Sequence, residues 1–228
     1  MRAHLLAATA LSTTVGFLVP GIALAQSVHD WSGFYVGLGA GAVNSQASID
    51  FTGLSSPIVP STVQLPTLGA DGSIKFGYNW QSGQFVYGLE NDLSVVTLQG
   101  THSGPNYTVT DSLNTLLSMR ARFGVSFDRM MVFATTGVAA GGASFDSNVT
   151  DFGKGTPAQA RGTVIGGVIG GGIEMAVNDN VSISATGTYY GLSPLHAVGD
   201  VGKGPPDDYT ATYSPHGTVF EAGVNVHF

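Results

Sequence analysis

Apolar and polar side chains alternate along most of the chain beyond residue 30. Because successive side chains of a β-strand point to opposite faces, this period of two predicts strands with one apolar face and one polar face. The last strand shows the pattern clearly: Phe220, Ala222, Val224, Val226 and Phe228 alternate with Glu221, Gly223, Asn225 and His227. The whole pattern predicts eight strands, over residues 33–43, 70–80, 84–98, 112–127, 130–144, 162–177, 180–192 and 216–228.

The connections between these strands alternate in length. Three are short and rich in Asn, Asp, Ser and Gly, at 81–83, 128–129 and 178–180. Four are long and polar and hold most of the prolines, at 44–69, 99–111, 145–161 and 193–215. This rhythm predicts an all-β fold, an eight-stranded antiparallel up-and-down barrel whose two ends of chain lie on the side of the short turns.

The period alone does not decide which face points inward. A soluble lipocalin-like barrel would bury the apolar face, whereas a transmembrane barrel would expose it. The second arrangement is favoured because the polar face is rich in glycine and serine and carries nearly balanced charges. These predicted interior charges are Lys75, Glu90, Asp92, Arg120, Arg122, Glu174 and Glu221. Aromatic residues of the apolar face gather beside the short turns, as in an interfacial girdle: Tyr78, Trp80, Phe85, Tyr87, Phe127 and Phe228.

The stretch GTVIGGVIGGGIEMAV, at 162–177, contains Gly166 and Gly170 at the GxxxG spacing of membrane helix dimers. Its apolar run is too short to cross a bilayer as a helix but long enough to cross as a tilted strand. We therefore expect a strand whose outer face carries Ile165, Ile169 and Ile173, with Glu174 inside.

The first 25 residues have the features of a secretory signal peptide. A positive start is followed by an apolar run, and small residues precede a predicted cleavage between Ala25 and Gln26. The predicted mature domain is 26–228. Removing Arg2 changes the formal charge from −7 to −8, which disfavours nucleic acid as a partner because phosphate binding needs clustered Lys and Arg. The absence of cysteine excludes a disulfide framework.

Five stretches carry a resemblance to a known family: DWSGFYVGLGAG (30–41), GYNWQSGQFVYGLENDLS (77–94), RARFGVSFDRMMVFATTGVA (120–139), GGGIEMAVNDN (170–180) and the terminal GVNVHF. Together they resemble the small outer-membrane barrel proteins of alphaproteobacteria, the porin-family or outer-membrane immunogenic proteins with an OmpA-like transmembrane barrel.

The resemblance implies a Gram-negative outer-membrane location, with both termini periplasmic and four loops outside. It implies a role in envelope integrity and surface contact, with lipid and lipopolysaccharide as neighbours and host or environmental ligands at the loops. The last strand, with Phe220, Val224, Val226 and Phe228 outward, resembles the signal read by the barrel-assembly machinery. Relatives tend to carry Arg and Glu on the inner face of the seventh strand, where this chain has Ser184 and Thr186.

No enzyme motif is present, and we expect no catalysis, no cofactor and no metal site. A lipid-hydrolysing barrel would need Ser, His and an acid together, and Ser214, His216 and Asp208 are the residues that the sequence offers. The acids near His196 (Asp200, Asp207 and Asp208) lack the spacing of a calcium loop. A narrow, low-conductance channel stays open as a second alternative, because the many inner glycines leave room in a lumen that eight strands otherwise fill with side chains.

Overall fold

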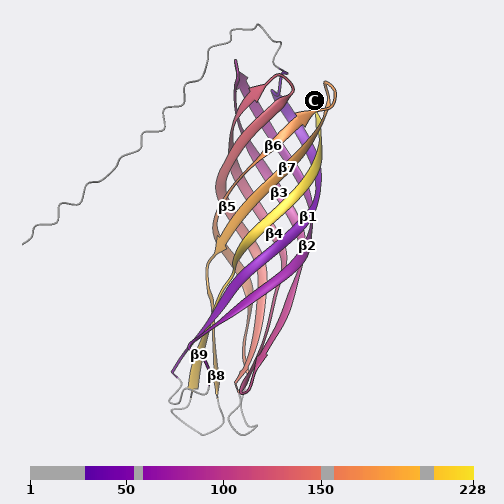
Figure 1. Cartoon of the computed structure of the whole chain (residues 1–228). Helices are drawn as coiled ribbons and strands as arrows, with labels where there is room; N and C mark the ends of the chain where they lie inside the picture. Colours follow the sequence, from indigo (N-terminus) through magenta and orange to yellow (C-terminus); the bar gives the residue numbers. More distant parts are fainter. Residues whose placement is uncertain (1–28, 54–58, 150–156, 201–207) are drawn as a thin grey trace, which may run out of the picture.

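The computed structural model describes residues 29–53, 59–149, 157–200 and 208–228. The predicted signal peptide, with its cleavage site at Ala25 and Gln26, lies outside the described residues, as does Asp207. The chain forms strands throughout (Figure 1), and they are β1 (Gly33–Thr52), β2 (Thr62–Ser82), β3 (Phe85–Gly104), β4 (Tyr107–Phe127), β5 (Met130–Val149), β6 (Ala158–Ala176), β7 (Val181–Leu192), β8 (Leu195–Asp200), β9 (Asp208–Ser214) and β10 (His216–His227). No helix within these ranges is long and apolar enough to cross a membrane.

Antiparallel ladders join each strand from β1 to β7 to the next one, and β10 pairs with both β7 and β1. The sheet therefore closes into a ring of eight strands, and the predicted all-β antiparallel up-and-down fold is confirmed. Both described ends of the chain lie at the end of the short turns (Figure 1). There the His29 N–H donates to the Asp128 carbonyl, and the Phe228 N–H donates to the Phe34 carbonyl.

The predicted loop 193–215 is wrong, because β8 and β9 occupy most of it. β8 continues the line of β7, and β9 leads into β10, so that together they form one long hairpin. The register changes by one residue between the pair His216–Gly191 and the pair Leu195–Tyr213. Pro194 and Pro215 lie at this break, since proline cannot donate a backbone hydrogen bond to the ladder.

The other predicted loops are also too long. β1 extends to Thr52, β2 begins at Thr62, and β3 and β4 are joined by a turn of only two residues, 105–106. The outer faces of these extensions carry many Ser, Thr, Asn and Gln residues. This polar composition is typical of loops, so it does not predict a strand when every strand is expected to have an apolar outer face. Pro66 lies within β2 rather than in a loop, at a level where β2 pairs with β1 but no longer with β3. Proline is compatible with such an edge.

The outward faces change from apolar to polar at one level around the ring, which we call the boundary. Toward the short turns the outward residues are apolar, apart from Asn91 and Thr136, over about the 9–11 residues per strand that a tilted strand needs to cross a bilayer. Beyond the boundary they are mainly hydroxyls and amides, with the charged Asp50, Asp146, Arg161 and Asp200 and the apolar Leu68 and Val198 among them. The boundary passes between Ala42 and Asn44, Val95 and Thr97, Leu117 and Thr115, Ile165 and Thr163, and Phe220 and Thr218.

The inward faces change in the opposite sense at the same level. On the short-turn side the barrel encloses polar and charged residues, and beyond the boundary it encloses a packed apolar cluster that includes Ile49, Leu65, Leu113 and Phe145. In this protruding half, the ladders between β2 and β3 and between β6 and β7 stop, which leaves two four-stranded sheets face to face. Tyrosines link them: the Tyr209 hydroxyl donates to the Ser147 carbonyl at 2.8 Å.

Candidate functional site in the barrel lumen

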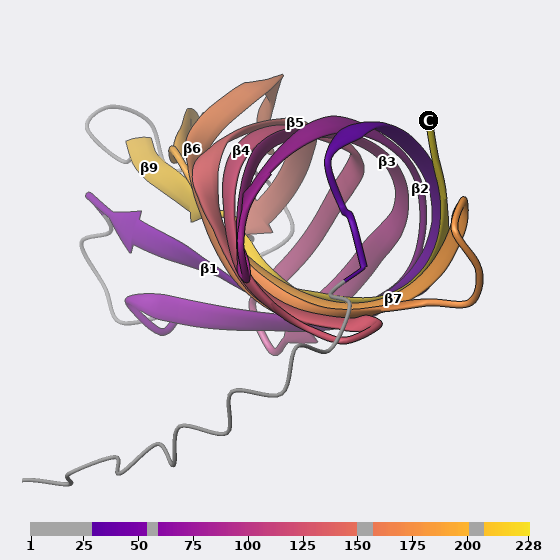
Figure 2. The same cartoon turned by 90° about the horizontal axis from the view of Figure 1, so that it is seen from above.

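A short N-terminal segment crosses the mouth of the barrel at the short-turn end (Figure 2). Trp31 points into the barrel and is fully buried among Val86, Met131, Phe133 and Ala176. Its indole Nε1 donates to Ser126 Oγ at 2.8 Å, so the one polar atom of the ring is satisfied. Trp31 therefore closes this end of the lumen.

Further contacts hold the segment in place. The Trp31 backbone N–H donates to Gln81 Oε1 at 2.7 Å, and the amide of Gln81 donates to the His29 carbonyl at 3.2 Å. The Ser32 N–H donates to Asp30 Oδ1, and this bond lowers the pKa of the Asp30 carboxyl. Burial, followed by the nearby His227, lowers the pKa of His29, which favours a neutral imidazole beside the Trp31 ring.

Next to Trp31 lies a buried ion pair between Arg122 and Glu174. The Arg122 guanidinium lies 3.7 Å from the centre of the Phe133 ring and donates to the Tyr35 hydroxyl at 3.3 Å. Tyr35 in turn donates to Glu90 Oε2 at 2.6 Å. Glu174 is also bonded by Ser182, and it accepts from Asn225 at 2.7 Å.

A second group of charges continues toward the boundary. Arg120 Nη2 donates to Glu90 at 2.7 Å and to Asp92 at 2.9 Å, and Lys75 is paired with Glu221. All seven predicted interior charges thus lie inside the barrel, joined in one network through Glu90 and Asp92.

The sequence analysis missed several interior polar residues. Tyr35, Ser182 and Asn225 bond to the charges, and Asp71 adds a buried carboxylate whose two oxygens have no hydrogen-bond partner among the described residues. All four lie on the inward faces of their strands, so the period of two could have identified them. Asn225 was already on the polar face of the predicted last strand, but only formally charged side chains in mid-strand were assigned to the interior network, which also left out Asp71 at the start of the predicted strand 70–80.

Beyond the charges, the apolar cluster of the protruding half fills the lumen. A small cavity of about 30 Å³, lined by Thr186, Thr188, Tyr190 and Arg120 among others, lies between the charge network and the apolar cluster. Its volume is close to the space that one water requires. Ser184 and Thr186, where relatives tend to carry a longer ion pair, are both half-buried, and Thr186 lines this cavity.

The predicted aromatic girdle lies on the outer surface beside the short turns. Tyr78, Trp80 and Tyr87 form a row, with ring centres 4.7 Å and 5.9 Å apart, and Phe85 and Phe127 are exposed nearby. On the last strand, Phe220, Val224, Val226 and Phe228 all point outward, and Phe228 is 77% exposed.

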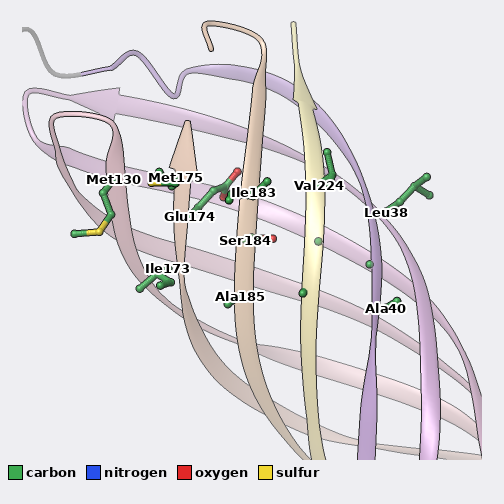
Figure 3. Close-up of a pocket in the computed structure, with 13 residues that line it drawn as sticks. Leu38, Ala40, Met130, Ile173, Glu174, Met175, Ile183, Ser184, Ala185 and Val224 are labelled. Carbon is green, nitrogen blue, oxygen red and sulfur yellow. The ribbon is translucent and has the colours of Figure 1, made fainter. Parts of the chain in front are cut away.

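The outer surface also has a shallow hollow of about 620 Å³ on β1, β10, β7 and β6 (Figure 3). Its floor is formed by Ala40, Ala222 and Ala185, which are paired across the three strands, and larger side chains such as Ile173 and Leu38 form its walls. The hollow is a dip in the same apolar band.

The residues considered for lipid hydrolysis do not come together. Ser214 and Asp208 are at opposite ends of β9, about 20 Å apart at the rise of a strand. His216 Nδ1 lies 3.1 Å from the backbone carbonyl oxygen of Ser214, so the ring contacts the backbone of Ser214 rather than its hydroxyl.

Ser182, His227 and Glu174 do lie together, buried behind Trp31. The same atom, His227 Nε2, approaches Ser182 Oγ at 3.0 Å and Glu174 at 3.2 Å. A catalytic triad uses both ring nitrogens, one toward the nucleophile and one toward the acid, so this group has the geometry of a structural contact.

The described residues include no candidate metal site. No three His, Cys, Asp or Glu side chains gather there in a way that would hold a metal. His196, expected near the acids of the last loop, instead contacts the Thr212 hydroxyl at 3.0 Å, on the outer face of β8 and β9.

Known proteins are similar to this chain in sequence and fold. A 31 kDa outer-membrane immunogenic protein of Brucella melitensis is 26% identical over 207 residues, which cover 86% of each chain. A 22 kDa outer membrane protein of Rhizobium leguminosarum bv. viciae is 30% identical over 155 residues, 67% of this chain and 60% of that protein. The solved structure of OprG of Pseudomonas aeruginosa has a TM-score of 0.51 at 13% identity, covering 86% of this chain and 96% of OprG, and shows the fold.

The family described as the outer membrane protein beta-barrel domain matches residues 10–228. The match agrees with the closed ring of eight strands, the outward apolar band and the inward charges. The chain therefore belongs to the outer membrane protein beta-barrel domain family and is an outer-membrane β-barrel protein.

Proposed function

We propose that the protein is a structural, surface-exposed component of the outer membrane that neither conducts solutes nor catalyses a reaction. In this proposal the short turns and both termini face the periplasm, and the protruding half with its loops faces the outside. The protein would contribute to envelope integrity through the barrel. The loops would contact host or environmental ligands.

The filled lumen is the observation that supports this proposal. From the short-turn end outward, the described residues place the buried Trp31, the charge network and the apolar cluster one after another across the interior. A conducting pore needs a continuous water-filled path. The packed residues around Trp31 and the apolar cluster of the protruding half both interrupt such a path. Eight-stranded barrels generally enclose only enough space for their own side chains.

Electrophoresis and conductance together test the proposal. Outer-membrane fractions run without boiling should contain a band that shifts on boiling, as expected when a folded barrel unfolds only on heating. The same purified protein, inserted into planar bilayers, should give no discrete conductance steps. Steps that appear reproducibly with the heat-shifting material would refute a sealed lumen, and recovery in the soluble periplasm would refute the location.

A further part of the proposal concerns assembly. The outward side chains of β10, ending in Phe228, form an aromatic and aliphatic column that the barrel-assembly machinery would recognise. Phe228→Ala should leave secretion unchanged and reduce the heat-shifting fraction in the outer membrane. Phe127→Ala, which removes an exposed aromatic residue at the same short-turn end but on β4, serves as the control. Wild-type levels of folded Phe228→Ala protein would contradict the role of the aromatic residue.

A further inference from the structure

The outward face of the protruding half is a belt in which hydroxyl and amide side chains predominate, with four charged side chains and apolar residues such as Leu68 and Val198 among them. We define the hydroxyl belt as the outward residues beyond the boundary, represented on different strands by Gln46, Thr101, Thr110, Ser144, Thr163 and Thr212. Most of them alternate along their strand with a residue of the inner apolar cluster, so the belt is the outer surface of both sheets.

On β1, β4, β5, β6 and β10 the belt begins directly where the apolar band ends, whereas on β2 the exposed Leu68 carries the apolar band one position further, level with Asn44. Register pairs carry the boundary from strand to strand: Asn44 pairs with Thr218, Thr163 with Gly142, and Gly142 with Thr115. The belt is therefore continuous with the surface that the bilayer covers. Whatever fills the layer directly above the lipid acyl chains lies against it.

The belt contains few charges for a surface in contact with bulk water. Its charged side chains among the described residues are Asp50, Asp146, Arg161 and Asp200, whereas a soluble surface carries roughly 25–35% charged residues. Only one of these four is a cation. The belt therefore does not have the clustered Lys and Arg that would bind phosphate groups.

Many belt hydroxyls are ordered in pairs across neighbouring strands. Thr101 and Thr110 lie 3.2 Å apart, and Ser112 and Ser144 lie 2.8 Å apart. A hydroxyl has one donor and two acceptor positions, so each pair keeps capacity for an external partner. Held side chains lose less conformational freedom on binding than free ones.

We propose that the hydroxyl belt binds the uncharged sugar chains of the glycolipids that surround the barrel. Sugar hydroxyls are donors and acceptors without charge, which matches the belt, and lipid anchoring places them directly above the apolar band. The inference rests on the proposed function in one respect, because it requires the protruding half to face the glycolipid-bearing leaflet.

The experiment compares the protein folded in three kinds of vesicle: phosphatidylcholine alone, phosphatidylcholine with a neutral digalactosyl lipid, and phosphatidylcholine with lipid A, which adds phosphates. The urea midpoint of unfolding should rise with the digalactosyl lipid and rise less, or not at all, with lipid A. The variant Thr101→Val/Thr110→Val/Thr163→Val/Thr212→Val removes four belt hydroxyls but keeps the β-branched shape, and it should lose at least half of the rise.

Thr136→Val is the matched control, because Thr136 points outward inside the apolar band, where sugars do not reach. It should keep the full rise. A rise of equal size with lipid A, a rise unchanged in the fourfold variant, or no rise with the digalactosyl lipid would each overturn the inference. Protein that shows no boiling shift in any vesicle would instead refute the proposed barrel function.

Discussion

The substitution Arg122→Ala is expected to destabilise the barrel by about 3–5 kcal/mol, because it leaves buried carboxylates without their counter-ion. Arg122 is 1% exposed, pairs with Glu174, and lies 3.8 Å from Glu90. Its removal would also empty the space against the Phe133 ring. The unfolding free energy in urea, measured on protein folded in vesicles, reports the loss. A smaller folded fraction on unboiled gels should accompany it.

Two comparisons separate the ion pair from a general effect of losing an arginine. Arg129→Ala removes an exposed arginine at a short turn, 3.8 Å from Asp179, and should cost about 0.5 kcal/mol or less. Arg122→Met combined with Glu174→Gln removes both charges and keeps the volume, so it should recover much of the stability lost in Arg122→Ala. If Arg122→Ala were as mild as Arg129→Ala, the charges would not act as a closed internal network.

The sequence was sufficient to predict the fold and the positions of the interior charges, because both depend on the period of two. Glu174, for example, lies between the outward residues 173 and 175. Its inward direction does not depend on where the strand is taken to begin or end. The strand ends themselves were predicted poorly. A strand outside the membrane has a polar outer face, so Thr101 and Ser103 read as loop although they belong to β3.

The reversal of the two faces at the boundary could not be read from the alternation. Along β1, the inward side changes from Gly37 and Gly41 to Val43 and Ile49 while the period continues unbroken. The lipocalin-like and the transmembrane arrangement of the two faces therefore each occur in one half of the protein. The transmembrane arrangement holds below the boundary, and an apolar interior holds above it. A bulge between Leu113 and Thr115 further shifts the parity of β4, which only the register reveals.

Ile169→Arg is expected to destabilise the barrel by about 2–4 kcal/mol, the cost of an arginine near the middle of the lipid-facing band of a barrel. Ile169 is 61% exposed on β6, between Ile165 and Ile173, so a longer side chain can extend outward without displacing buried residues. The cost therefore comes from the surrounding lipid. Urea unfolding in vesicles measures it, and the effect should shrink in detergent micelles, where water reaches the arginine more readily.

Val198→Arg provides the matched control because Val198 is 65% exposed on β8, beyond the boundary. In contact with water or sugar, its arginine should change stability by no more than about 0.5 kcal/mol. Ile169 and Val198 are both β-branched, point outward and have similar exposure. The main difference between the two positions is the medium that covers them. Equal costs at both sites would mean that the boundary does not separate lipid from water, and the inverted faces of the two halves would then need another cause.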